Sequence, residues 1–318
     1  MSNSSTIRLG TRGSALARTQ ANWVASQLRD AGHDVDLIEI STQGDEKTSV
    51  SVASLGSVGV FTKEIQRALL DDTIDLAVHS LKDLPTDFIE NLTLASVPPR
   101  EDCGDALISA GDVSFEDLTE GARIGTSSLR RCSQLLHQRP DLTLCDIRGN
   151  VDTRLRKLTD GEYDAIVLAE AGLNRLGLSE HITEVLPKDW MLPAVGQGAL
   201  GLETRTDDET TRAAVATLDD AATHSSVLAE RAMLLALAGG CLAPIGAWGR
   251  TDSDTLLLDA VVLSRDGKQR IAAADKAELP AAGEQAASAE FAKELGRTVA
   301  KQLLDQGAAD LIAAARAE

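Results

Sequence analysis

The sequence predicts an α/β protein with sheets covered on both faces, followed by a small domain of the α+β class. Over the first two thirds, short apolar strands alternate with amphipathic helices, which is typical of parallel sheets. Residues 97–100 and 191–198 contain Pro and Gly and are expected to cross between domains. The last third has paired strands and then one long helix. A length of 318 residues allows two or three domains.

The first domain is expected to open with a strand and a helix. Residues 7–10 form the strand, and Ser14 begins a helix whose apolar residues fall on one face. Residues 42–59 are rich in Ser, Gly and other small residues, so we expect a long loop there. Such a loop in a compact domain is more often functional than idle. The other expected elements are strands over residues 35–41 and 74–78 and a helix near residues 61–69.

The second domain repeats this alternation, and the third departs from it. After the first crossing we expect strands near residues 123–125, 142–147 and 164–168, with helices over residues 128–138 and 151–158. The second crossing is followed by a strand over residues 199–203 and two helical stretches that end near Ala238. The last expected elements are strands over residues 245–249 and 255–264, a hairpin turn at Asp266 and Gly267, and a helix over residues 286–304.

Composition and charge exclude several classes of function. The formal net charge of −18 disfavours nucleic acid as a partner, because phosphate binding needs clustered basic charge. The four cysteines form no CxxC pair and show no zinc-ligand spacing with the five histidines, so we expect no metal site. The first ten residues lack the apolar stretch of a secretory signal, which together with free thiols indicates the cytoplasm.

The basic residues are skewed toward arginine. Only 9 of the 31 basic residues are lysines. An acidic, lysine-poor surface resembles that of proteins from salt-loving organisms, where screening weakens self-repulsion. An acidic protein from an ordinary habitat is the alternative.

Two suggestive patterns are rejected. Residues 232–249 carry no charge, but Gly and Pro interrupt them. They also fall short of the roughly 20 apolar residues that a spanning helix needs, so no membrane contact is expected. Residues 196–201 match the dinucleotide pattern G-x-G-x-x-G, which requires a strand before it and a helix after it. Pro193 precedes these residues and a strand is expected next, so they form a crossing loop instead.

Arginines recur where strands end and helices begin. Residues 125–131, GTSSLRR, follow a strand and open a helix, with hydroxyl groups placed to cap free amides. Arginines in the first turn of a helix oppose its dipole unless an anion lies there. Since ligands of open α/β sheets bind outside the carboxyl ends of strands, these arginines suit carboxylates or phosphates. Solvated arginines beside an ordinary cap are the alternative. Similar placements are expected for Arg12 with Ser14 and for Arg148 with Arg154, and Arg175 is expected just after the helix that follows residue 168.

Two further segments could carry chemistry. Residues 79–85, HSLKDLP, leave a buried strand, and Pro85 constrains the turn that holds Lys82 and Asp83. A carboxylate there could be a general acid, a general base or a stabiliser of a cation, although a surface turn is the alternative. His79 is expected to be a packed strand residue. Cys241 follows two glycines at a helix end. The carboxyl end of a helix raises the pKa of a thiol, so a standing thiolate nucleophile is disfavoured there. The alternative is that Cys241 is only a small apolar residue in a tight loop.

Taken together, seven segments resemble the porphobilinogen deaminases, also called hydroxymethylbilane synthases. They occur in the family's order over nearly the whole chain, and motifs of this length are highly specific. The segments are TRGSALA, AVHSLKDLP, GTSSLRR, IRGNVDTRL, DAIVLAEAGLNRLGL, LPAVGQGALGLE and AERAMLLALAGGCLAPIG.

The resemblance implies an activity and a cofactor. Members of the family join four porphobilinogen units head to tail, with release of ammonia at each step, to give hydroxymethylbilane. They do so on a dipyrromethane cofactor that a thioether links to the cysteine of the GGC segment, here Cys241. A permanent anchor of this kind needs no standing thiolate. The aspartate of the KD turn, here Asp83, is implied to assist loss of the amine and to stabilise the resulting cation.

The resemblance also implies which residues bind the pyrroles. Each pyrrole carries an acetate and a propionate, so the growing chain is a polyanion that charge-assisted hydrogen bonds can orient. The implied cofactor-binding residues are Lys82, Asp83, Thr126, Ser128, Arg130, Arg131, Arg148, Gly149 and Arg154. The implied porphobilinogen-binding residues are Arg12, Ser14, Gln20, Phe61, Arg148, Arg154 and Arg175.

The family fold implies three domains and a monomer. Two doubly wound clamshell domains resemble periplasmic binding proteins, and a small α+β domain presents the cysteine loop. The implied ranges are residues 5–98 with 199–218, residues 103–193, and residues 221–318.

The sequence departs from the family at three positions. Ser54 and Val58 stand where many bacterial relatives have lysines, and Gly104 stands where an arginine is common.

Two other classes of protein remain possible from the sequence. A non-catalytic anion-binding clamshell would need the arginines but neither Asp83 nor Cys241. A cysteine hydrolase would want a histidine partner.

Overall fold

The computed structural model describes residues 6–41, 62–87, 89–238, 243–280 and 285–317. Residues 1–101 and 199–224 form one compact unit, and residues 102–198 and 225–318 form a second. The chain therefore leaves the first unit and returns to it close to the two segments that the sequence marks as crossings. The three domain ranges stay a prediction.

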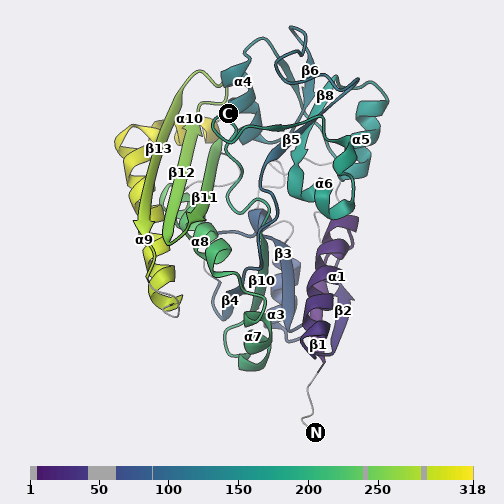
Figure 1. Ribbon diagram of the computed structural model, residues 1–318, viewed down its shortest axis with the longest axis vertical. Coiled ribbons are helices and arrows are strands. Elements are labelled where there is room, and N and C mark those ends of the chain that lie inside the picture. Colours follow the sequence, from purple (N-terminus) through teal and green to yellow (C-terminus); the bar gives the residue numbers. More distant parts are fainter. Residues whose placement is uncertain (1–5, 42–61, 88, 239–242, 281–284, 318) are drawn as a thin grey trace. The chain divides into compact units, whose positions relative to one another are not determined.

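The first unit is built on a five-stranded sheet. Its strands are β1 (Ile7–Thr11), β2 (Val35–Glu39), β3 (Leu76–Ser80), β4 (Leu92–Ser96) and β10 (Leu200–Arg205). Its helices are α1 (Ala15–Asp30), α3 (Lys63–Leu70) and α7 (Glu209–Ala216). The strand order is β2-β1-β3-β10-β4 (Figure 1). Val24 of α1 and Val215 of α7 pack on one face, while Ile65 and Leu69 of α3 pack on the other. Both faces are therefore covered.

The second unit contains a sheet of the same kind. Its strands are β5 (Asp105–Ser109), β6 (Arg123–Gly125), β7 (Thr143–Cys145), β8 (Ala165–Ala169) and β9 (Glu184–Leu186), in the order β7-β6-β8-β5-β9. Its helices are α4 (Leu129–Gln138), α5 (Val151–Thr159) and α6 (Glu170–Leu176). Leu135 of α4 packs on one face, and Leu158 of α5 and Leu173 of α6 pack on the other.

A separate antiparallel sheet completes the second unit. Its strands are β11 (Ile245–Asp252), β12 (Thr255–Leu263) and β13 (Arg270–Glu278). Three helices pack against it through a shared aliphatic core: α8 (Ala221–Ala236), α9 (Gln285–Asp305) and α10 (Ala308–Ala317). Asp266 and Gly267 lie in the turn between β12 and β13, as the sequence predicts. The α/β class and the small α+β part are thereby confirmed.

The prediction of parallel sheets is only partly right. Strands β1, β2 and β3 run parallel, but β10 runs antiparallel to both β3 and β4. In the second unit, β6 runs parallel to β7 and β8, but β5 runs antiparallel to β8 and β9. Each antiparallel strand is the first strand after one of the two crossing segments. It therefore lacks the helical crossover that a parallel connection requires.

Residues 200–205, which follow the crossing loop and include the last matched glycine, form the strand β10 and not a helix, so the match at residues 196–201 is not a dinucleotide-binding motif. Within the described part of the chain, no helix has the length and apolar character needed to cross a membrane.

Candidate functional site

A pocket lies in the first unit where β1 and β3 end. It has about 420 Å³ of free space, including the adjoining solvent. Ser14 caps the start of α1, and its Oγ accepts a hydrogen bond from the backbone N of Ala17 at 3.3 Å. The residues that line the pocket are Arg12, Ser14, Leu16, Ala17, Gln20, Thr62, Val78, His79, Ser80 and Asp83. Four residues that the resemblance selects as binding or catalytic residues therefore line the same pocket: Arg12, Ser14, Gln20 and Asp83.

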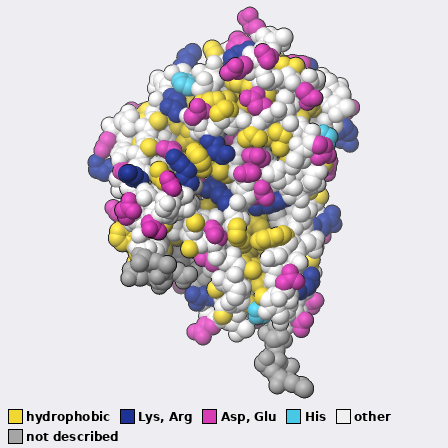
Figure 2. All heavy atoms as spheres, viewed as in Figure 1, with side chains coloured by type: hydrophobic (Ala, Val, Ile, Leu, Met, Phe, Trp, Pro, Cys, Tyr) yellow, Lys and Arg dark blue, Asp and Glu magenta, His cyan; other side chains and the backbone are white. Residues whose placement is uncertain are grey.

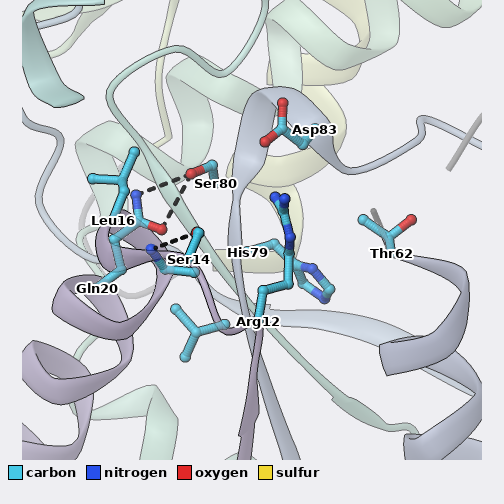
Figure 3. Close-up of a pocket in the computed structure, with 10 residues that line it drawn as sticks. Arg12, Ser14, Leu16, Gln20, Thr62, His79, Ser80 and Asp83 are labelled. Atoms are coloured by element: carbon cyan, nitrogen blue, oxygen red, sulfur yellow. Dashed lines mark hydrogen bonds between the residues drawn. The ribbon is translucent and has the colours of Figure 1, made fainter. Parts of the chain in front are cut away.

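One wall of the pocket is fixed by a hydrogen bond between α1 and β3. Gln20 is buried, and its Nε2 lies 2.9 Å from Ser80 Oγ, which also lies 3.2 Å from Gln20 Oε1 (Figure 3). In the same view, the Arg12 side chain extends from the end of β1 toward the side on which Asp83 lies. A cationic and an anionic side chain therefore face one hollow, which suits a substrate that carries both signs of charge.

Asp83 lies on a tight turn directly after β3. Residues Leu81–Asp83 form one 3-10 turn, and Leu81 N donates to the carbonyl oxygen of Ala199 at 3.0 Å. Leu81 is buried, whereas the side chains of Lys82 and Asp83 are exposed. Anchoring of Leu81 therefore presents Asp83 to the pocket. Lys82 lies in the same turn but does not line the pocket.

A buried polar trio lies against the pocket at His79. The Nε2 atom of His79 is 3.0 Å from Glu203 Oε2, and Gln66 Nε2 donates to Glu203 Oε1 at 3.1 Å. All three side chains are buried. His79 is a packed strand residue, as expected, but it also lines the pocket. Sequence reasoning missed Glu203 and Gln66, although a glutamate within the apolar segment LGLE was a usable signal.

In the second unit, the segment GTSSLRR opens α4 as predicted. Ser128 is the cap residue, and its Oγ accepts from Arg131 N at 3.5 Å. Thr126 is buried, and its Oγ1 accepts from Ser128 N at 3.3 Å. These hydroxyl groups fix the end of β6 against the first turn of α4. That turn contains Arg130 and Arg131.

Arg130 and Arg131 are buried and share one carboxylate, that of Asp105. Arg130 Nη1 donates to Asp105 Oδ2 at 2.5 Å, and Arg131 Nε donates to Asp105 Oδ1 at 2.9 Å. Burial alone would raise the pKa of Asp105, but the two guanidinium groups hold it well below its usual range. Sequence reasoning did not select Asp105. An aspartate that opens the apolar strand Asp105–Ser109 was the available signal.

Arg148 precedes α5, Arg154 lies within it, and the charges of Arg131 and Arg148 both act on Arg154. Asn150 caps that helix, and Arg154 Nε donates to the carbonyl oxygen of Gly149 at 2.8 Å. Burial lowers the pKa of Arg154 to about 10, and the charges of Arg131 and Arg148 act in the same direction. Gly149 has a φ of +112°, which favours glycine. We call Arg131, Arg148 and Arg154 the arginine group. Its mutual repulsion favours an anionic ligand.

The remaining predicted residues are Arg175, Phe61 and Cys241. Arg175 lies in the last turn of α6, and its Nη2 donates to the carbonyl oxygen of Gly198 at 2.7 Å. It therefore contacts the second crossing segment. Phe61 and Cys241 lie outside the described residues.

Family models and curated relatives match this chain over most of its length. A family model described as "Porphobilinogen deaminase, dipyromethane cofactor binding domain" matches residues 7–213, and one described as "Porphobilinogen deaminase, C-terminal domain" matches residues 224–305. The porphobilinogen deaminase of Geobacter metallireducens is 48% identical over 96% of this chain and 94% of its own. That of Desulforudis audaxviator is 48% identical over 98% of both chains.

Among solved structures, a methionine-binding protein aligns with 71% of this chain and 93% of its own. Its TM-score is 0.43 and its sequence identity is 16%, so the likeness carries no weight for fold or ligand. The family models and the two relatives cover both units almost completely. The chain therefore belongs to the porphobilinogen deaminase family, transferases that use a dipyrromethane cofactor.

Proposed function

We propose that this chain links its dipyrromethane cofactor through Cys241 and condenses four porphobilinogen units by means of Asp83. The pocket that combines Arg12, Ser14, Gln20 and Asp83 is the observation that carries this proposal. Family membership favours this enzyme over a non-catalytic anion-binding protein or a cysteine hydrolase. A pure anion binder would need the arginines, but not a carboxylate facing the same hollow.

The residues present fit a polyanionic cofactor. Burial and like charge lower the pKa of Arg154 to about 10, so carboxylates in contact with the arginine group would relieve an existing repulsion. In addition, Arg130 Nε is buried and has no hydrogen-bond partner among the described residues. A guanidinium N–H that is left unpaired costs free energy, and a bound carboxylate can satisfy it. When bound, the cofactor supplies the pyrrole end to which new units are added.

The first unit is proposed to handle the incoming porphobilinogen. Arg12 binds a carboxylate of the substrate, and the Ser14 hydroxyl and the Gln20 amide orient it. The bond between Gln20 and Ser80 holds the amide in place before substrate arrives (Figure 3). Positioning by fixed groups lowers the entropy cost of bringing two reactants together.

Asp83 is proposed to act on the aminomethyl end of the same substrate. As ammonia leaves, the substrate becomes cationic, and the exposed Asp83 carboxylate stabilises that charge. The same oxygen atoms then accept the proton that the pyrrole ring loses when the new carbon–carbon bond has formed. The anchored turn at Leu81 keeps this carboxylate at the pocket through every round.

The second unit is proposed to hold the growing chain. Arg131, Arg148 and Arg154 donate to its carboxylates, with Thr126 and Ser128 at the start of α4 and Gly149 before α5. Arg130 completes this set in the second unit. Lys82 of the first unit is also proposed to bind the cofactor, and Arg175 is proposed to bind the incoming porphobilinogen. Charge-assisted hydrogen bonds contribute about 1.5–3 kcal/mol each, which is enough to orient a flexible polyanion.

Intact mass tests the proposal directly. Protein produced in a host that makes porphobilinogen is expected to carry two linked pyrrole units and to redden with an acidic aldehyde reagent for pyrroles. Incubation with porphobilinogen is expected to give a linear tetrapyrrole. A chain at its bare sequence mass that forms no tetrapyrrole would contradict the enzyme function.

The proposal extends to the state of the protein in the cell. We propose a cytoplasmic monomer from a salt-loving organism. Free thiols at Cys103, Cys132 and Cys145 support a reducing compartment. The net charge of −18 supports the salt-loving origin, and Figure 2 shows acidic side chains scattered over the visible face.

A further inference from the structure

Asp105 holds two arginines from a position that solvent does not reach. It is the first residue of β5, and its relative exposure is 0%. Besides the bonds from Arg130 and Arg131, its Oδ1 accepts from Gln197 Nε2 at 3.0 Å. A buried carboxylate with this many donors is held in one orientation, because no rotation would keep all of its bonds.

The guanidinium group of Arg131 is fixed from two sides. Its Nε and Nη2 atoms lie 2.9 and 2.7 Å from Asp105 Oδ1. On the other side, its Nη1 donates to the carbonyl oxygen of Val167 in β8 at 3.0 Å. A guanidinium carries five N–H donors in one plane. Three contacts to the protein therefore set that plane and leave two donors for a ligand.

The arginine group would not keep this arrangement by itself. Arg131 and Arg148 both act to lower the pKa of Arg154, whereas Asp146 opposes them. Asp146 is paired with Arg148 through a bond of 3.0 Å from Arg148 Nε. Asp105 is the buried carboxylate that Arg130 and Arg131 share, and it offsets part of their positive charge before any ligand is present. Without it, like charges in a poorly solvated region would repel one another strongly.

We propose that Asp105 is a positioning residue for the cofactor, because it orients Arg131 before the cofactor binds. The inference rests on the proposed function, since it takes a cofactor carboxylate as the ligand of Arg131. It assigns to Asp105 a part in binding without contact with the ligand. A donor set that is already oriented loses less conformational entropy on binding, so the loaded chain is stabilised further.

A purely structural ion pair would behave differently. It would stabilise the unloaded and the loaded chain by the same amount, so its removal would leave the gain in stability on loading unchanged. A positioning residue contributes to that gain. The difference between the unfolding midpoints of the loaded and unloaded chains therefore separates the two roles.

The test compares the wild-type chain with Asp105→Asn and with Asp164→Asn as a control. Asn keeps the shape of Asp and removes its charge. Asp164 also pairs with an arginine, Arg123, but it is half-exposed and precedes the start of β8. Full-length chains are produced in a host without porphobilinogen and then loaded with added porphobilinogen. Intact mass gives the loaded fraction, and thermal unfolding gives the midpoint before and after loading.

The two variants are expected to differ in how much loading raises their unfolding midpoint. Asp164→Asn is expected to keep the wild-type gain in midpoint on loading. Asp105→Asn is expected to keep roughly half of that gain or less, and its loaded fraction is expected to rise more slowly. If Asp105→Asn lowers both midpoints equally and keeps the full gain, Asp105 is not a positioning residue.

A second measurement needs no variant and covers the case in which Asp105→Asn does not fold. Hydrogen exchange at arginine Nε–H is followed by NMR in the unloaded wild-type chain. Arg131 is expected to exchange much more slowly than Arg67, whose side chain is 82% exposed. Equal rates would overturn the inference. If the wild-type chain never gains two pyrroles, the proposed function fails, and the exchange rates still decide whether Asp105 holds Arg131.

Discussion

The Nδ1–H of His137 donates to the carbonyl oxygen of Gly267 at 2.7 Å, which joins the β12–β13 turn to α4. Ser133 Oγ, one turn earlier in α4, donates to the carbonyl oxygen of Arg265 at 3.2 Å. A Cβ atom on Gly267 would lie 2.6 Å from the Ser133 carbonyl oxygen and 2.7 Å from His137 N. The turn therefore rests on the backbone of the helix whose first turn carries Arg130 and Arg131.

This contact predicts that Gly267→Ala destabilises the protein more than a matched glycine variant. Gly267 has a φ of +72°, and Gly161 has a φ of +76° but open space, with no atom within 4 Å of where its Cβ would lie. Each alanine variant is expected to lose about 1 kcal/mol of unfolding free energy through backbone strain. Gly267→Ala is expected to lose about 1–3 kcal/mol more, because its Cβ meets backbone atoms that cannot move aside. Urea unfolding measures both, and equal losses would contradict the prediction.

Asp83→Asn is expected to fold and to lose turnover by about 10²–10⁴-fold. The amide keeps the shape of the side chain but cannot accept the proton or stabilise the cation. Asp87→Asn is the control, because Asp87 is also exposed and follows closely in the chain but does not line the pocket. Initial rates of tetrapyrrole formation are measured on fully loaded protein. Near-normal rates for Asp83→Asn would remove the role proposed for this residue.

Cys241→Ser is expected to yield a chain at its bare sequence mass, because a hydroxyl group does not form the thioether. The measurement is intact mass after incubation with porphobilinogen. Cys145→Ser is the control, since that thiol is half-buried and its Sγ lies 3.9 Å from the carbonyl oxygen of Thr143. The control is expected to load normally. Two added pyrroles on Cys241→Ser would place the attachment on another residue.

Asp75 is expected to make stability depend on pH in the acid range. Burial acts to raise its pKa, but bonds from Arg8 and Arg205 outweigh burial and lower the pKa from 3.8 to about 2. A depressed carboxyl pKa stabilises the fold above the unfolded pKa, and this contribution is lost as the pH falls from about 4 to about 2. The difference in unfolding midpoint between wild type and Asp75→Asn is therefore expected to shrink across that window.

The control for this prediction is Asp71→Asn. The pair of Asp71 with Arg67 is a surface contact at 3.4 Å between largely exposed side chains, and such pairs contribute little. Its midpoint is expected to follow the wild type at every pH. A constant difference between wild type and Asp75→Asn from pH 4 to pH 2 would show that the ion pairs of Asp75 do not titrate there.

Salt is expected to raise the unfolding midpoint. With a net charge of −18, the folded chain repels itself, and screening shortens the range of this repulsion from about 10 Å at 0.1 M salt to about 3 Å at 1 M. Thermal unfolding in potassium chloride measures the effect, and chloride avoids the additional stabilisation that sulfate gives through exclusion. A flat response would count against a salt-loving origin.

Local patterns predicted most elements of the fold but not the direction of every strand. Apolar periodicity and cap residues placed α1, α4 and α5 to within about two residues, because these signals lie within the elements themselves. The strands β4 and β5 and the helix α10 were not expected, and β5 and β10 run opposite to the predicted parallel sheet. Strand direction depends on the path of the chain between sheets, which periodicity does not contain.

The candidate site shows the same division. Arg12, Ser14, Gln20 and Asp83 were expected near strand ends, and they line one pocket. Asp105 and Glu203 were missed, because their partners are 25 and 124 residues away in sequence. A charged residue within an apolar strand was visible in both cases. Its partner depended on which strands and helices become neighbours.

The position of β10 has a consequence for biosynthesis. This strand lies between β3 and β4, yet it comprises residues 200–205. The first sheet therefore stays divided while the ribosome adds the roughly one hundred residues that follow β4. The strands of the second sheet all lie between residues 105 and 186, so that sheet can close first. We expect the second sheet to fold before the first. The strands of the first sheet are then exposed to chaperones until residues 200–205 have been synthesised.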